Sequence, residues 1–481
     1  MPKLGLVGQS YTSESILADC NRTVNWYPEI IEDPLGKVRI ALYPTPGYSL
    51  WGTLTEAPTR GQIYTGGVHY AIGGSKVHIV SSTGTPTAMS GSISNDGVQC
   101  HLAASNTQVL IISAGLGYYI SAGALAPITN AAFPSNAGSS VLGCGYVDGY
   151  FIVAASDSRF YISGLNDVTS WAALDSDAIQ FSANKLVSML IDKRETWLFG
   201  DRISQAFYNS GRASFPFEAV PSGSVEYGMV AHCSAAKIDD SFIWLDASDR
   251  GDGRVVEANG YIPTRVSNHA VEYAIGRYAT KSDAVAWSYS VKGHSFYVLT
   301  FPAQNTTWVY DTVTKMWFEW LYWNATQARY EAHRGISHIM AFGNHIIGDR
   351  TNGKLYKIAL DVWTEDGLPA RRLRRCPHVY SGPNNIAHKR LWLGVETGVG
   401  LNVSSGTSGY DPQLDMRYSD DGGKTYISQD SVSLGKQGEY TTQVEWRGLG
   451  STSVSRVYEL SCYEPVPVRL LDAEVDTQVV R

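Results

Sequence analysis

An apolar run, a short polar turn and a second apolar run stand together near residue 150. Tyr150–Ala155 and Arg159–Ser163 are rich in β-branched and aromatic residues, and Ser156, Asp157 and Ser158 between them are typical turn residues. The pattern predicts a β-hairpin. Its first strand is apolar on both faces, and a lone hairpin is marginal in water. We therefore expect similar hairpins elsewhere in the chain to cover it.

The same pattern of strand, turn and partner strand occurs six more times. The further first strands are Val68–Gly73, Val109–Ala114, Thr196–Gly200, Ser241–Leu245, Ser295–Phe301 and His345–Asp349. Their partners are Lys76–Ser81, Gly117–Ser121, Ser204–Tyr208, Gly253–Ala258, Thr306–Asp311 and Gly353–Ile358. The hairpins recur about every 40–50 residues, which is the period of β-propeller blades. An irregular stack of β-sandwiches also contains strands and turns, but the regular spacing favours the propeller.

Seven hairpins favour seven blades, and a six-bladed ring with one hairpin outside it is also possible. Small residues end or follow several first strands, whereas the partner strands carry many aromatic residues. We therefore expect the first strands to crowd the central axis and the partner strands to face outward. The small residues are Gly73, Gly74, Ala114, Gly115, Ala154, Ala155 and Gly200.

Two flanking segments do not follow the repeat and set the expected boundaries. Residues 1–48 form an N-terminal extended segment with prolines and aromatics, residues 49–361 form the propeller, and residues 362–481 form a C-terminal β-sandwich-like platform on which the N-terminal segment packs. The strands predicted in the platform are Arg390–Val395, Gln413–Tyr418, Val444–Arg447 and Arg456–Cys462. The fold class expected for the whole chain is all-β.

One helix is predicted as a short insertion between two blades. His269–Ala279 carries Val271, Ile275 and Tyr278 on one face, and Ser267 and Asn268 before it are candidate capping residues.

Composition and charge narrow the class of protein. Only 17 % of the residues are charged, and 47 glycines and 29 tyrosines are typical of a turn-rich β protein. The net charge of −7 argues against a dedicated nucleic-acid clamp. The six cysteines lie far apart in sequence, which favours free thiols in a reducing compartment over disulfides. Neither a signal peptide nor an apolar run of the ~20 residues that cross a membrane is evident, so we expect a soluble product of a cytosol.

The sequence contains no recognisable cofactor or metal motif. The histidines include no H-E-x-x-H pattern, and the adjacent His232 and Cys233 have no second pair of ligands nearby in sequence. We therefore predict no cofactor, no metal site and no catalytic residues, and we expect that the chain is not an enzyme.

One short motif keeps a different function open. Ser419, Asp421, Gly423, Thr425 and Tyr426 fit the S-x-D-x-G-x-T-aromatic pattern of the Asp box, which recurs in sialidase propellers. We expect a hairpin turn in which Asp421 accepts backbone N–H bonds and the glycines supply positive φ angles. The motif occurs once, outside the predicted blades, and no arginine cluster with a tyrosine nucleophile can be assembled around it. A glycan-binding or sialidase-like propeller is the alternative function, and a monomeric protein-interaction propeller is a third.

The densest basic cluster follows the propeller. It consists of Arg371, Arg372, Arg374 and Arg375. Such a cluster is either a solvated turn or a docking surface for an acidic neighbour or for nucleic-acid phosphates.

Several motifs, in their order along the chain, resemble those of the packaged-DNA-stabilisation proteins of short-tailed bacteriophages, which form the tail hub or nozzle. The resemblance covers most of the chain. The matching segments are Asn25–Glu29, Thr45–Gly47, Asp157–Phe160, Trp197–Gly200, Phe215–Glu218, Trp308–Asp311, Gly348–Asp349, Asn352–Tyr356 and Thr364–Gly367.

The resemblance implies a structural role in a virion tail, assembled in the cytoplasm of the bacterial host. It implies a homo-oligomeric ring, most simply a hexamer, below the portal and its adaptor or head-completion protein. Such a ring closes the DNA exit channel, retains packaged double-stranded DNA and conducts it during ejection without sequence-specific binding. Distal partners would be a tail needle, plug or tailspike. Rings form through heterologous contacts, and we expect exposed aromatics such as Trp26 and Tyr27 to serve as assembly anchors.

Overall fold

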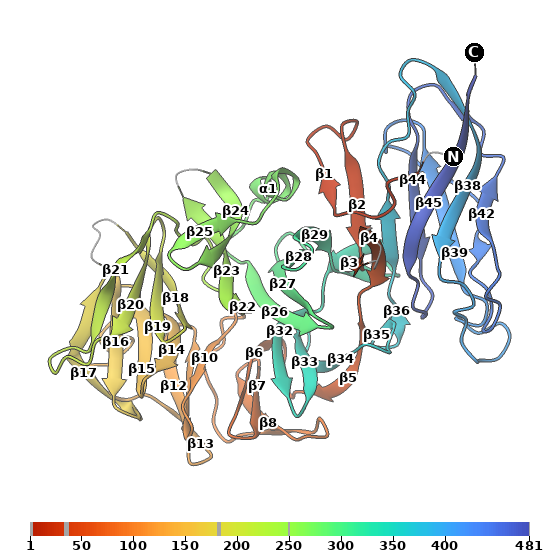
Figure 1. Ribbon diagram of the computed structural model, residues 1–481. Coiled ribbons are helices and arrows are strands. Elements are labelled where there is room, and N and C mark those ends of the chain that lie inside the picture. The colour runs from red at the N-terminus through yellow and green to blue at the C-terminus, as the bar shows by residue number, and fades with distance from the viewer. Residues whose placement is uncertain (1–2, 33–37, 180–183, 249–250, 481) are drawn as a thin grey trace.

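The computed structural model describes residues 3–32, 38–179, 184–248 and 251–480 and contains seven four-stranded antiparallel blades in sequence order (Figure 1), with a central cavity between them. Blade one contains β6 (Thr59–Thr65), β7 (Val68–Gly73), β8 (Lys76–Val80) and β9 (Pro86–Ala88). Blade two contains β10 (His101–Ala104), β11 (Gln108–Ser113), β12 (Leu116–Ser121) and β13 (Ala124–Pro127). Blade three contains β14 (Val141–Val147), β15 (Tyr150–Ala155), β16 (Arg159–Gly164) and β17 (Asp167–Ala178).

The remaining blades continue in sequence order. Blade four contains β18 (Leu186–Asp192), β19 (Glu195–Gly200), β20 (Ser204–Asn209) and β21 (Phe217–Val225). Blade five contains β22 (Ala236–Ile238), β23 (Ser241–Ser248), β24 (Gly251–Asn259) and β25 (Ile262–Arg265). Blade six contains β26 (Val285–Val291), β27 (His294–Phe301), β28 (Thr306–Asp311) and β29 (Met316–Glu319). Blade seven contains β32 (Gly335–Ala341), β33 (Asn344–Asp349) and β34 (Lys354–Ala359), with β5 (Gly47–Thr53) as its fourth strand.

The propeller and its seven blades are confirmed, and every predicted hairpin is the second and third strand of a blade. The prediction that these first strands crowd the axis is wrong. The strand before each hairpin lies innermost, so residues of β6, β10, β14, β18, β26 and β32 line the central cavity. The small residues accommodate connecting segments instead: a Cβ on Gly73 would meet the Glu56 carbonyl oxygen at 2.4 Å, and one on Gly200 would meet the Asn184 side chain at 2.0 Å.

Blade seven joins the two ends of the propeller sequence. β5 pairs antiparallel with β34, with Gly47 opposite Ala359 and Thr53 opposite Lys354. A strand from before the first blade therefore closes the ring, so the ends of the propeller are held together by a ladder of backbone hydrogen bonds.

The predicted helical insertion is confirmed as α1 (His269–Gly276), between blades five and six. The Asn268 side chain accepts the Val271 N–H at 2.9 Å, which is the expected N-cap interaction. Val271 and Ile275 are buried against blade five and blade six residues. The helix ends three residues earlier than predicted, at a boundary that sequence patterns define poorly.

A β-sandwich follows the propeller, and two sheets form it (Figure 1). One sheet runs in the order β3 (Trp26–Glu32), β4 (Val38–Pro44), β45 (Leu470–Val480), β38 (Asn385–Val395) and β42 (Val444–Arg447). The other includes β2 (Cys20–Val24), β37 (Arg372–Arg375), β44 (Val457–Cys462), β39 (Gln413–Ser419) and β40 (Ile427–Ser428). Short strands complete the structure: β1 (Tyr11–Thr12), β30 (Leu321–Asn324), β31 (Arg329–Ala332), β35 (Thr364–Glu365), β36 (Leu368–Pro369), β41 (Val432–Ser433) and β43 (Ser451–Thr452).

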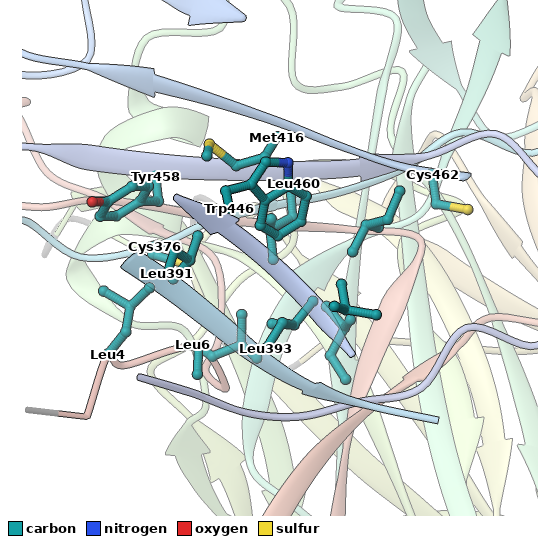
Figure 2. Packing of buried hydrophobic residues seen from close by; sticks show 14 of the residues in the cluster. Leu4, Leu6, Cys376, Leu391, Leu393, Met416, Trp446, Tyr458, Leu460 and Cys462 are labelled. Carbon is teal, nitrogen blue, oxygen red and sulfur yellow. The ribbon is translucent and has the colours of Figure 1, made fainter. Parts of the chain in front are cut away.

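The sandwich has one apolar core between its sheets. Figure 2 shows Leu391 and Leu393 from one sheet, Met416 and Leu460 from the other, and Leu4 from the N-terminal segment around it. The N-terminal segment is thus part of this core, and its strands β3 and β4 extend one of the sheets. Four predicted platform strands correspond to β38, β39, β42 and β44, whereas β37 and the eleven-residue β45 were not predicted.

Six cysteines are free, as expected, and Cys20, Cys100, Cys376 and Cys462 are buried. Among the described residues, no helix is long and apolar enough to cross a membrane.

Candidate assembly site

The basic cluster after the propeller is a strand at the junction of propeller and sandwich. Strand β2 pairs with the outermost strand of blade six, β29, through Val24 and Glu319, and its other edge pairs with β37. One continuous sheet therefore runs from blade six into the sandwich. Of the four predicted docking residues, Arg372 and Arg374 are buried there, whereas Arg371 and Arg375 are partly exposed.

Arg372 and Arg374 are each only 1 % exposed, so the prediction that they form a docking surface or a solvated turn is wrong. The Arg374 guanidinium donates to Thr23 Oγ1 at 2.9 Å, Asn21 Oδ1 at 3.0 Å and the carbonyl oxygens of Gly5, at 3.1 Å, and Leu6. Buried charges persist where their donors are satisfied, and here the N-terminal segment supplies the acceptors.

Arg371 lies among three aromatic rings. Its guanidinium carbon is 4.4 Å from the Trp323 ring centroid, 5.3 Å from that of Tyr330 and 5.1 Å from that of Tyr463. Trp323 and Tyr330 come from the β30–β31 hairpin and Tyr463 from the sandwich, so cation–π contacts connect the two parts.

Arg375 forms a second arginine-rich group around one buried carboxylate. Glu459 is 1 % exposed and accepts hydrogen bonds from Arg375 Nε at 2.9 Å and from Arg417 Nε at 2.6 Å. The three residues stand opposite one another on adjacent strands β37, β44 and β39. Arg417 and Arg375 also lie 4.5 Å and 5.2 Å from the Tyr426 ring centroid.

Trp26 and Tyr27, the predicted assembly anchors, are buried within the chain. Trp26 is in the sandwich core and donates its indole N–H to the Val468 carbonyl oxygen at 2.9 Å. Tyr27 packs edge-on against Phe296 of blade six, with ring centroids 5.4 Å apart. Their exposure was inferred from position in a flanking segment, and long-range packing covers both rings.

Asn25, between β2 and β3, connects three parts of the structure and was missed as a functional residue. Its φ of 58° lies in the left-handed region, which asparagine tolerates better than most residues. Its Nδ2 donates to the carbonyl oxygens of Leu321 at 2.8 Å and Arg371 at 2.7 Å, and its Oδ1 accepts the Leu321 N–H at 2.8 Å. An asparagine followed by aromatic and proline residues was the available signal.

The Asp-box segment forms the expected turn. Asp421 accepts the backbone N–H groups of Lys424 and Thr425 at 2.9 Å each and the Thr425 hydroxyl at 2.6 Å. Ser419 Oγ accepts the Gly423 N–H at 2.8 Å, and Gly423 has a φ of 93°. Hydrogen bonds from the Thr425 hydroxyl and amide hold the pKa of Asp421 well below its usual range. The carboxylate therefore organises its own turn, which lies in the sandwich beside Leu17 rather than in a blade.

A second buried carboxylate lies on the propeller side of the junction. Glu365 pairs with Tyr48 of the closing strand β5 and is 3 % exposed. Burial raises the pKa of Glu365 to about 8, while Arg334 and Arg372 act in the opposite direction. The folded chain thus holds a proton that the unfolded chain, with a pKa near 4.5, releases.

Because the pKa of Glu365 is raised in the folded chain, we expect the stability of the protein to depend on pH. Between the two pKa values the native state binds more protons, so the contribution of Glu365 to stability falls as the pH rises. Between pH 6.0 and pH 7.5 the free energy of unfolding of the wild type is expected to fall by about 2 kcal/mol relative to that of Glu365→Gln. The slope is about 1.4 kcal/mol per pH unit. Urea unfolding of both proteins at each pH measures this difference, in which other titrating groups cancel. A difference that stays constant or grows in favour of the wild type would contradict the prediction.

Comparisons with known proteins identify the family. A family model described as the β-propeller of bacteriophage P22 Gp10 matches residues 22–363, and one described as its β-sandwich matches residues 373–478. A comparison with curated protein sequences found no match.

Solved structures with similarity include the WD40 propeller domain of Doa1 and the N-terminal domain of Nup159. The Doa1 domain is 10 % identical with a TM-score of 0.40, over 65 % of this chain and 97 % of that one. The Nup159 domain is 11 % identical with a TM-score of 0.41, over 70 % and 98 %. The fold assignment rests on the strand pairing within this chain and on the two family models. Because these models match most of its length, the chain belongs to the bacteriophage P22 Gp10 family of packaged-DNA-stabilisation proteins, and is a structural component of a phage tail.

Proposed function

We propose that this chain forms a ring in the tail hub, or nozzle, below the portal and its adaptor. The ring closes the DNA exit channel, retains the packaged genome and conducts it during ejection. The observation that carries the proposal is the match of both domains to the P22 Gp10 models. The proposed role is structural rather than enzymatic.

The channel of one propeller does not suit passage of a duplex. It holds a cavity of about 360 Å³, lined by side chains such as Leu102, Met189 and Trp287. A cavity of this size holds a small cluster of waters, whereas the major groove of DNA alone is about 12 Å wide. We therefore infer that the conduit is the lumen of a ring of several copies, a hexamer in our proposal.

The net negative charge of the chain supports a lumen through which DNA passes without binding to the wall. Each copy carries a net charge of −7, and a ring multiplies this charge around its lumen. Like charge between wall and phosphates disfavours long-lived contacts, so DNA would slide without sequence-specific binding.

The contacts between the propeller and the sandwich fit a role in which the two domains must keep fixed positions relative to each other. Strand β2 hydrogen-bonds to both parts, and Asn25, Arg371 and Arg374 add side-chain contacts across the same region. Two domains fixed in this way hold adaptor-facing and distal surfaces at a constant separation. The proposed partners are the portal adaptor on one side and a needle, plug or tailspike on the other.

DNA retention tests the proposal directly. A phage carrying a stop codon in this gene should produce heads that package DNA and then lose it, so nuclease-protected DNA falls by at least tenfold. Supplying the wild-type chain from a plasmid should restore protection. Equal protection with and without the chain would contradict the proposed role.

Imaging tests the ring itself. Purified chain, alone and mixed with the adaptor, should give a ring with a central opening wider than a DNA duplex in electron micrographs. Deleting residues 363–481 would not test ring formation. The deletion removes β37 and β44 from the sheet that continues into blade six, and it uncovers Trp26, so the remaining chain would be destabilised. A ring without an opening, or a single copy bound to the adaptor, would contradict the conduit.

A further inference from the structure

Two histidines and a cysteine from different blades meet at the centre of the propeller. His101 begins β10, the innermost strand of blade two, whereas His232 and Cys233 lie in the segment between blades four and five. One potential ligand atom from each residue lies within 4.8 Å of the others. Cys233 Sγ is 3.9 Å from His101 Nε2, and the two imidazole centroids are 5.6 Å apart. Proximity in sequence gave no sign of this group, because His101 is more than a hundred residues away.

We propose that His101, His232 and Cys233 bind a transition-metal ion, Zn²⁺ in the first place, that connects blade two to the segment between blades four and five. Two imidazoles and one thiolate are ligands that Zn²⁺ prefers, and hard ions such as Mg²⁺ and Ca²⁺ prefer oxygen. Three protein ligands leave a fourth position for water or another side chain.

The observed separations fit a small contraction onto a metal. With Zn–N near 2.0–2.1 Å and Zn–S near 2.3 Å, a tetrahedral site places its ligand atoms about 3.3–3.6 Å apart. The His101–Cys233 separation of 3.9 Å is already close to this range. The other separations are at most 4.8 Å, so they would have to shorten by roughly 1 Å or more when a metal binds.

The backbone of each ligand is held in place. The Cys233 carbonyl oxygen accepts the Ala286 N–H at 2.8 Å, and the His232 carbonyl oxygen accepts the Ser188 hydroxyl at 2.7 Å. His101 is fixed by strand pairing with Ile112.

Space and further donors surround the group. His232 and Cys233 line both the central cavity and a second cavity of about 360 Å³, so solvent can approach from two sides. Cys100, Cys144 and Met189 line the central cavity as well and offer further sulfur atoms. An ion therefore has an entry path and candidates for its fourth ligand.

Without metal, the Cys233 thiol can make a weak hydrogen bond to His101. That contact explains one pair, whereas a metal accounts for all three side chains converging across blades that are not neighbours. A metal at this point would stabilise the propeller, because it would connect blade two to the segment before blade five through bonds to both.

Cobalt binding to the full chain tests the proposal. Protein stripped with a chelator is titrated with Co²⁺, and we expect one ion per chain, a thiolate-to-cobalt charge-transfer band and the intense visible bands of four-coordinate cobalt. Added Zn²⁺ should abolish these bands and raise the thermal midpoint of the stripped protein by a few degrees. Absence of the bands in the wild-type chain would overturn the proposal, whatever the variants do.

Variants identify the ligands. Cys233→Ser should lose the charge-transfer band, and His101→Gln should weaken cobalt binding at least tenfold. Cys20→Ser is the matched control, since it removes a buried thiol from the sandwich, far in the fold from the central cavity, where Cys20 Sγ lies 3.9 Å from the Cys376 carbonyl oxygen. Circular dichroism checks that each variant folds. Unchanged bands in folded Cys233→Ser would show that the cobalt lies elsewhere and would refute the site.

Discussion

A Trp26→Ala variant is expected to lose about 3–5 kcal/mol of unfolding free energy, the usual cost of truncating a fully buried aromatic residue. Trp26 is completely buried in the sandwich core. The substitution leaves a cavity and also leaves the Val468 carbonyl oxygen without its indole donor. Urea unfolding followed by fluorescence and circular dichroism measures the loss.

This variant also distinguishes a core residue from an assembly anchor. Tyr440 is an aromatic control in the same sandwich, because the residue is 73 % exposed, and Tyr440→Ala should change stability by about 0.5 kcal/mol or less. If Trp26 were an anchor between copies, Trp26→Ala would weaken the ring and leave the stability of a single copy unchanged. That result would contradict the buried position.

A Glu459→Gln variant is expected to lose about 3 kcal/mol of unfolding free energy. This value lies at the lower end of the range for variants that break a buried ion pair. The neutral amide leaves Arg375 and Arg417 facing each other without a carboxylate between them. The lower end applies because the side chains of both arginines keep some exposure, 17 % and 38 %.

Glu445→Gln is the control for Glu459. Glu445 also accepts from two arginines, Arg390 and Arg447, but the Arg447 side chain is 71 % exposed. The Glu445 side chain is 14 % exposed against 1 % for Glu459, and solvent screens its pairs, so this variant should lose about 1 kcal/mol or less of unfolding free energy. Equal effects of the two substitutions in urea unfolding would show that burial of the Glu459 carboxylate does not matter.

The blade pattern was predictable because a hairpin is a local structure. In blade three, β15 and β16 are joined by the turn at Asp157, whose carboxylate accepts the Arg159 N–H at 3.1 Å. Each such contact spans only a few residues, so residue type and spacing carry the information. The cap of α1 by Asn268 and the Asp-box turn of Asp421 followed for the same reason.

The innermost strands were not recognised because no local pattern shows which strand of a blade lies at the axis. β10 (His101–Ala104) and β22 (Ala236–Ile238) are short, but β14 has seven residues that alternate between buried and half-buried positions. The position of these strands follows from how blades pack around a ring. The hairpin strands that carry the small residues were therefore placed at the axis, although they lie one strand further out.

The candidate site shows where sequence reasoning stops. Four arginines in five residues are normally solvated, and nothing in their order shows that Arg374 finds acceptors on Thr23 and Asn21, about 350 positions away. Burial of Trp26 likewise depends on Val468, at the other end of the chain.

The all-β class, the period of the blades, their hairpins, the helix cap and the Asp-box turn could all be predicted from residue type and spacing. Long-range packing was needed to show that β5 closes the ring, that the basic cluster includes a buried strand, and that His101 lies beside Cys233. The two groups differ in how far apart the contacting residues are along the chain. Local hydrogen bonds and side-chain periodicity depend on residues that are neighbours in sequence. The burial of a residue and the partners of a charged group depend on distant segments that folding brings together.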